Sequence, residues 1–148
     1  MYGRIRGIVT VAVLALAAAC ADRGVVAPDG PLAARAGTTY PMTFTVTQSY
    51  SAGTAQTAAG GTGTIDFSGT LQTPTPCFDV TAVNSASRGI TVTVRGVDSG
   101  GICTQVVTWN NYAGQITNLA AGSYALRVEH VLGGGRASTA WSGTVVVR

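Results

Sequence analysis

Apolar and polar residues alternate with a period of two through most of the chain after Thr39. In residues 90–95, for example, Ile90, Val92 and Val94 alternate with two threonines and Arg95. Successive side chains of a strand point to opposite faces, so such a segment buries one face and exposes the other. No segment after Thr39 shows the helical period. This part of the chain is therefore expected to be all-β.

Glycine, proline and asparagine divide this part into about eight strands. The expected strands are 40–51, 62–71, 77–82, 89–97, 102–109, 115–119, 123–132 and 139–147. Residues 98–101 (Asp-Ser-Gly-Gly) favour a tight turn, which predicts an antiparallel hairpin of 89–97 with 102–109. Turns are also expected at 84–88 and at Asn110 and Asn111. Residues 51–61 are expected to be a loop or a weak hairpin extension.

Short strands of this number over about 110 residues predict an antiparallel β-sandwich. The connections are too short for the helical crossovers that join parallel strands. An up-and-down barrel is the alternative.

The first 19 residues have the layout of a secretory signal peptide. Arg4 and Arg6 precede an apolar run over 8–18, and small residues follow. The run is shorter than the roughly 20 residues that cross a bilayer as a helix. The segment therefore predicts export and does not predict a transmembrane anchor.

Leu16-Ala17-Ala18-Ala19-Cys20 resembles the lipobox of bacterial lipoproteins. The resemblance implies cleavage before Cys20 and attachment of fatty acids such as palmitate there, which would anchor the protein because two or more acyl chains bind a membrane stably. Ala17 stands where that family usually has leucine. Two alternatives stay open: ordinary cleavage that leaves Cys20 unmodified, and cleavage before Asp22 that removes Cys20.

Residues 20–38 are expected to be a flexible tether, and residues 39–148 the folded domain. Prolines and glycines interrupt the tether, and its apolar residues show no period. A coil of this length has a mean span of about 20 to 25 Å. The alternative is a leader strand, to which Val25 and Val26 would contribute.

Without Cys20, two cysteines remain, Cys77 and Cys103, and an exported chain is expected to pair them. The chain-entropy model assigns such a crosslink roughly 3 to 4 kcal/mol. The scattered cysteines, acids and single histidine have no metal-ligand spacing, so neither a metal nor another cofactor is expected.

The charge of the chain disfavours nucleic acid as a partner. The sequence has nine arginines, no lysine and six acidic residues, a net charge of +3. Arg4 and Arg6 leave with the signal peptide, which lowers the net charge to +1. The remaining arginines are scattered, whereas nucleic-acid binding needs clustered cations.

Residues 116–128 are similar to the late-strand region of fibronectin type III and immunoglobulin-like modules. A leucine, a glycine turn and Tyr124 lead there into a long strand. The resemblance implies an immunoglobulin-like sandwich and a tyrosine corner, in which the Tyr124 hydroxyl bonds backbone a few residues upstream. Tyr124 is not followed by cysteine two residues later, and no tryptophan lies midway between Cys77 and Cys103. Only the architecture is carried over.

The sequence shows no catalytic constellation. Glu129 and His130 are neighbours on one strand, so their side chains point to opposite faces. Glu129 shares a face with Arg127, which predicts a solvent-facing ion pair, and His130 is expected to cap the core edge. Asp66, Asp79 and Asp98 fall on different segments, and Asp98 is expected to bond the backbone of its turn. The protein is therefore not expected to be an enzyme.

The aromatic residues suggest one candidate recognition loop, formed by Trp109, Asn110, Asn111 and Tyr112. Loops on a rigid sandwich are frequent binding sites. Trp141 has the phase of the core residues of its strand and is expected to pack there.

These observations predict a non-enzymatic cell-envelope lipoprotein with one immunoglobulin-like sandwich and a binding or structural role. Its lipid on Cys20 would hold it on a membrane, the outer membrane being favoured, at the periplasmic or surface face. An envelope protein or a glycan would be its partner. The alternative is a soluble secreted binding or inhibitor module with the same fold, and a small hydrolase is the least favoured function.

Overall fold

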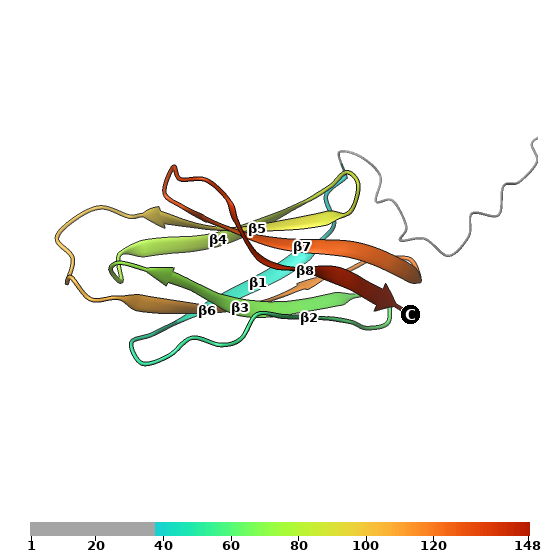
Figure 1. Ribbon diagram of the computed structural model, residues 1–148, viewed down its shortest axis with the longest axis horizontal. Coiled ribbons are helices and arrows are strands. Elements are labelled where there is room, and N and C mark those ends of the chain that lie inside the picture. Colours follow the sequence, from blue (N-terminus) through green and yellow to red (C-terminus); the bar gives the residue numbers. More distant parts are fainter. Residues whose placement is uncertain (1–37) are drawn as a thin grey trace, which may run out of the picture.

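The computed structural model describes residues 38–148, which form eight strands packed as two layers (Figure 1). The strands are β1 (Met42–Ser49), β2 (Thr57–Gly60), β3 (Ile65–Thr73), β4 (Phe78–Ala86), β5 (Ile90–Asp98), β6 (Thr108–Ile116), β7 (Gly122–Leu132) and β8 (Ser138–Val147).

The strands form two separate four-stranded sheets. The first sheet has the order β1-β6-β3-β2 and is antiparallel throughout. The second has the order β4-β5-β7-β8. The all-β sandwich is therefore confirmed, and the alternative of an up-and-down barrel is excluded.

One pair of strands, β5 and β7, is parallel, with Ile90 beside Leu126 and Val94 beside His130. The chain leaves the second sheet after β5, adds β6 to the first sheet and then returns as β7. This passage through the opposite layer serves as the crossover that parallel strands require. The expectation of antiparallel pairing throughout was wrong at this one place, which also departs from the two antiparallel sheets of an immunoglobulin domain.

The predicted hairpin of 89–97 with 102–109 was also wrong, because its two strands lie in different sheets. Its first strand lies between β4 and β7, whereas β6 lies between β1 and β3 in the other sheet. Residues 99–107 are the loop that crosses from one layer to the other. The separate strand predicted at 115–119 is the end of β6 followed by a turn at Asn118, whose φ is 61°.

The core lies between the two sheets and is built from the inward residues of the alternating segments. Ile90, Val92 and Val94 of β5 are at most 1% exposed and belong to one core cluster with Ile65 and Ile116 of the first sheet. Each such burial contributes about 1.5 to 3 kcal/mol relative to an exposed side chain. Trp141 packs against this core, as expected.

The chain enters the sandwich beside the last residues of β4. The Ala86 amide donates to the Thr38 carbonyl at 2.9 Å. The side chain of Asn84 accepts from the Tyr40 amide and donates to the Tyr40 carbonyl, each at 2.8 Å. Asn84 was predicted to begin a turn, but it lies within β4, which continues to Ala86. The turn therefore begins later than expected.

The sandwich has two ends, which carry different loops (Figure 1). We call the end with loops 50–56, 74–77, 99–107 and 133–137 the far end. The entry end has Thr38, the turns 61–64, 87–89 and 117–121, and Arg148. Strand β4 runs from the far end to Thr38 at the entry end, a distance of about 30 Å for nine extended residues.

The tyrosine corner is confirmed at the entry end. The Tyr124 hydroxyl donates to the Ala120 carbonyl at 3.0 Å. This bond ties the turn before β7 to the strand that follows it.

Candidate binding surface

The predicted recognition loop is not a loop. Trp109, Asn110, Asn111 and Tyr112 lie within β6, which is hydrogen-bonded to strands on both sides. Asn110 is 0% and Tyr112 3% exposed, so neither can form a surface for recognition.

Asparagine favours turns because its side chain competes for backbone bonds, but Asn110 is held inside the sandwich by two hydrogen bonds. Its Nδ2 donates to the Leu71 carbonyl at 3.2 Å and to Thr73 Oγ1 at 2.9 Å. Its Oδ1 is buried with no hydrogen-bond partner among the described residues. Asn111 faces the other way and accepts from the Thr70 hydroxyl at 2.6 Å. Tertiary contacts therefore overrode the local turn preference.

The predicted disulfide is confirmed. Cys77 and Cys103 are bonded, with their Cα atoms 6.1 Å apart. Cys20, the predicted signal peptide and residues 20–37 of the predicted tether lie outside the described residues.

Large apolar side chains are concentrated at the exposed surface of the far end. Eight such residues of the described chain are exposed, and six belong to this end. We call these six residues the far-end patch: Tyr50, Val97, Ile102, Val106, Val107 and Leu132. The other two, Val83 and Val146, lie in β4 and β8.

The disulfide loop presents the most exposed member of the patch. Ile102 is fully exposed and is followed directly by Cys103, whose disulfide holds the loop to the start of β4. The Ser99 amide donates to the Cys77 carbonyl at 3.0 Å, and the Thr108 hydroxyl donates to the Val106 carbonyl at 3.2 Å. Ser99 at the start of the loop and Cys103 in its middle are thereby held to Cys77, and Ile102 lies exposed between them.

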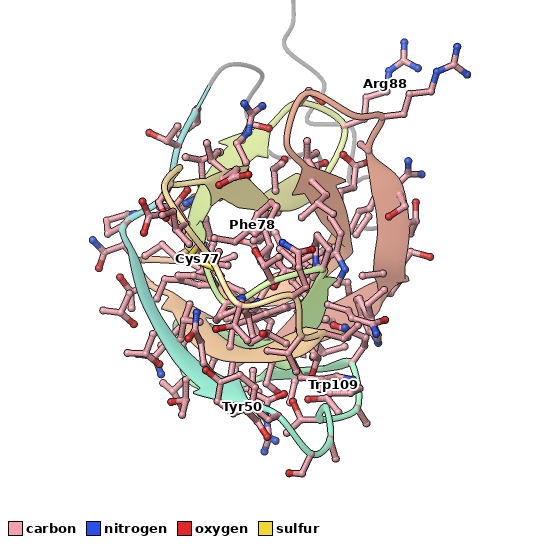
Figure 2. All side chains as sticks on the ribbon, turned by 90° about the vertical axis from the view of Figure 1, so that its left-hand side faces the viewer. Tyr50, Cys77, Phe78, Arg88 and Trp109 are labelled. Atoms are coloured by element: carbon pink, nitrogen blue, oxygen red, sulfur yellow. A yellow bond between two sulfur atoms is a disulfide. The ribbon has the colours of Figure 1, made fainter. Side chains whose placement is uncertain are left out.

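Figure 2 looks directly at the far end, where Tyr50, Cys77, Phe78 and Trp109 come from different elements. Beneath the loop the interior is polar, with Thr73, Thr108 and Asn110 each at most 1% exposed. The far end therefore exposes large apolar side chains, and it buries these three polar residues beside Leu71.

This patch was not predicted from the sequence, because residues 102–109 were expected to form a strand. One signal was available: residues 102–107 (Ile-Cys-Thr-Gln-Val-Val) show no regular alternation.

A second polar arrangement lies in the interior between the layers. The Tyr112 hydroxyl donates to Gln56 Oε1 at 2.6 Å and bonds His130 Nε2 at 2.8 Å. Because the hydroxyl has one proton, His130 Nε2 must be the donor in the second bond. Gln56 fills space left by Gly69, where a Cβ would lie 1.7 Å from its Oε1, and its Nε2 donates to the Thr70 carbonyl at 3.0 Å. These hydrogen bonds connect His130 of β7, through Tyr112 and Gln56, to Thr70 of β3.

Burial changes the acidity of both rings in this network. Desolvation raises the pKa of Tyr112 far above its ordinary value, because a buried phenolate would lose its hydration. Desolvation also lowers the pKa of His130, because the buried imidazolium loses hydration. Both groups are therefore neutral at pH 7, which suits a structural link between the layers.

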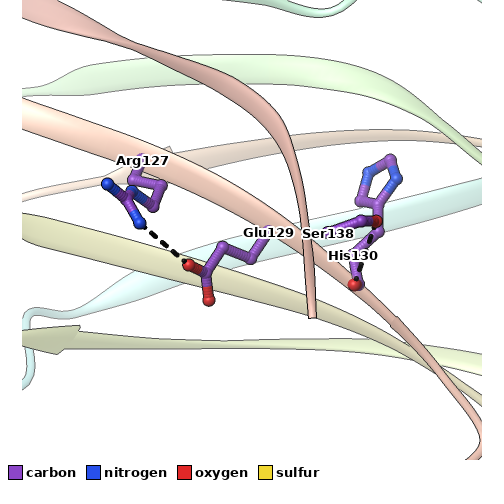
Figure 3. A network of polar contacts seen from close by, with 4 residues as sticks. All are labelled: Arg127, Glu129, His130 and Ser138. Carbon is purple, nitrogen blue, oxygen red and sulfur yellow. Dashed lines mark hydrogen bonds and ion pairs between the residues drawn. The ribbon is translucent and has the colours of Figure 1, made fainter. Parts of the chain in front are cut away.

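The charged residues near His130 lie as predicted. Arg127 and Glu129 form an ion pair with 3.5 Å between nitrogen and oxygen, and Figure 3 shows His130 on the other side of the strand. Ser138 donates to the His130 carbonyl at 3.4 Å. The bond to Tyr112 places the His130 ring between the two sheets. The prediction that His130 only caps the edge of the core was therefore wrong.

The acidic residues Asp66 and Asp98 are engaged locally and lie apart. Asp98 Oδ1 accepts from the Gly100 amide at 2.8 Å, which confirms its turn role, and Asp66 accepts from Gln115 at 2.7 Å. Residues 38–148 contain no cluster of three or more histidine, cysteine or acidic residues that could hold a metal ion. In the same residues no helix is long and apolar enough to cross a membrane.

Comparison of the chain with protein-family models, curated proteins and solved structures gave no match. The function is therefore inferred from the residues alone.

Proposed function

We propose that the protein is a non-enzymatic cell-envelope lipoprotein, held on a membrane through Cys20, which binds another envelope protein through the far-end patch. The observation that carries the proposal is the concentration of six exposed apolar side chains at the end opposite Thr38. An anchor that precedes Thr38 would join the domain at the end opposite the patch, so it would leave the patch uncovered.

The chemistry of the patch favours a protein partner. Exposed apolar residues gathered at one end of a soluble domain commonly mark an interaction site. Five of the six patch residues are aliphatic, and aliphatic side chains offer a sugar neither stacking nor hydrogen bonds. Residues 99–107 also contain no charge, which suits an apolar protein surface and disfavours nucleic acid. A protein is therefore preferred to a glycan.

The disulfide supports export. Disulfides persist in oxidising compartments and are rare in the cytosol. The Cys77–Cys103 bond is compatible with the signal peptide predicted over 1–19, and the lipobox-like end of that segment supports attachment of lipid to Cys20.

The anchor is tested by intact mass spectrometry of the protein extracted from membranes. An acylated Cys20 terminus is expected, and a Cys20→Ala variant should be released from the membrane fraction. A terminus at unmodified Cys20 or at Asp22 would support instead the alternative, a secreted module with the same binding surface.

The binding surface is tested by placing a photo-crosslinking residue at position 102 and, as a matched control, at position 83. Val83 is 66% exposed but lies in β4, away from the patch. Crosslinks to one discrete protein from position 102, absent from position 83 and lost when Val106 and Val107 are changed to serine, would support the proposal. Equal crosslinking from both positions would contradict it.

A further inference from the structure

A groove lies at the entry end of the second sheet. Its volume is about 430 Å³, and the turn between β4 and β5 forms one wall while β7 and β8 form the other. Six of the residues that line it give the groove its character: Arg88, Gly89, Ala125, Arg127, Ser142 and Thr144.

The groove exists because its floor is made of small residues. Gly89 lies so close to β7 that a Cβ added to it would be 2.7 Å from the Ala125 carbonyl oxygen and 3.1 Å from the Ala125 Cβ. The turn therefore packs directly on β7 at this point, and Arg88 and Arg127 lie on either side of it.

The groove is positively charged. No acidic residue lines it, whereas two arginines do. Arg88 is exposed in the turn, and Figure 2 shows it extending from the body. Arg127 pairs through one nitrogen with Glu129, which lies outside the groove, and its side chain is 58% exposed. The hydroxyl groups of Ser142 and Thr144 supply neutral hydrogen-bond donors beside the two cations.

We infer that this groove binds a phosphate group. Guanidinium groups present planar donor pairs that match phosphate oxygens, and hydroxyl groups can complete the shell. The groove has the size of a small-molecule site rather than of a single ion, so the phosphate is expected to be part of a larger molecule. The groove lies at the end where Thr38 enters, and a phospholipid headgroup or a soluble phosphorylated compound would supply the same chemistry there.

The test uses the mature chain with Cys20→Ser, so that lipid on Cys20 cannot itself bind vesicles. Inorganic phosphate is titrated at low ionic strength while the amide resonances of Gly89 and Ala125 are followed. In parallel, the protein is pelleted with phosphatidylcholine vesicles with and without phosphatidylglycerol. We expect shifts at these amides, and a loss of affinity of roughly fivefold for Arg88→Ala and for Arg127→Ala.

Two further variants make the test specific. Arg95→Ala removes an exposed arginine of the same sheet outside the groove, and it should leave binding unchanged. Glu129→Gln releases Arg127 from its ion pair and should strengthen binding.

Phosphate binding that the groove variants weaken indicates a soluble ligand, and vesicle binding that they weaken indicates a headgroup; both results support the inference. Binding of neither probe, or binding that Arg95→Ala weakens as much as the groove variants do, overturns it. These outcomes do not depend on crosslinking at position 102, so the two proposals can fail separately.

Discussion

Tyr112 of β6 and His130 of β7 are hydrogen-bonded across the interior of the sandwich, with 2.8 Å between the hydroxyl oxygen and Nε2. The two rings meet edge to face, with their centroids 5.7 Å apart. The bond links one sheet to the other within a largely apolar interior. It is the clearest place to test how polar contacts contribute to the stability of this fold.

Removal of the Tyr112 hydroxyl should destabilise the domain. Tyr112→Phe leaves Gln56 Oε1 and His130 Nε2 without their shared partner, which should cost about 1 to 3 kcal/mol of unfolding free energy. Urea denaturation measures the change. Tyr50→Phe, at a residue 60% exposed, is the control and should have almost no effect. An equal effect of the two substitutions would show that the interior network does not stabilise the fold.

His130 should make the stability depend on pH. Burial lowers its pKa in the folded state below the ordinary value, so the unfolded chain binds the proton more readily. The stabilising contribution is therefore complete above about pH 6.5 and is lost as the pH falls through the folded-state pKa.

The measurement is urea denaturation of the wild type and of His130→Gln at pH 7.5 and below pH 6. The wild type should lose more stability on acidification than the variant does. Identical losses would show that the acidic residues, and not His130, cause the acid sensitivity.

Loss of the disulfide should destabilise the whole domain and loosen the far end. The bond joins residues 26 apart in sequence, and Cys77→Ser with Cys103→Ser should cost roughly 3 to 4 kcal/mol. Hydrogen exchange should accelerate most in residues 99–107. An unfolding free energy equal to that of the wild type, or unchanged exchange in residues 99–107, would contradict this prediction.

Gly60 should not tolerate a side chain. A Cβ there would lie 1.9 Å from the Val146 carbonyl oxygen, where the edge of β2 meets β8. Gly60→Ala must push these edges apart and should cost about 1 to 3 kcal/mol. Gly134→Ala is the control, because no atom lies within 4 Å of a Cβ at that position. Thermal unfolding compares the two, and equal melting temperatures would contradict the close approach.

The local pattern of residues determined much of this structure. The alternation at 90–95 identified β5 and its inward face, since side-chain direction along a strand depends only on the chain itself. The Cys77–Cys103 pair, the Tyr124 corner and the shared face of Arg127 and Glu129 were likewise predictable. The disulfide followed from the number of cysteines, the tyrosine corner from the resemblance to fibronectin type III modules, and the shared face from the phase of the strand.

The tertiary structure alone decided which sheet each strand joins. A period of two shows that a strand has a buried face, but it does not distinguish a hairpin partner from a strand of the opposite layer. Residues 102–109 were therefore predicted to be half of a hairpin, and Asn110 was predicted to lie in a turn. Only the packing of β6 between β1 and β3 buried that asparagine and left Ile102 exposed at the far end.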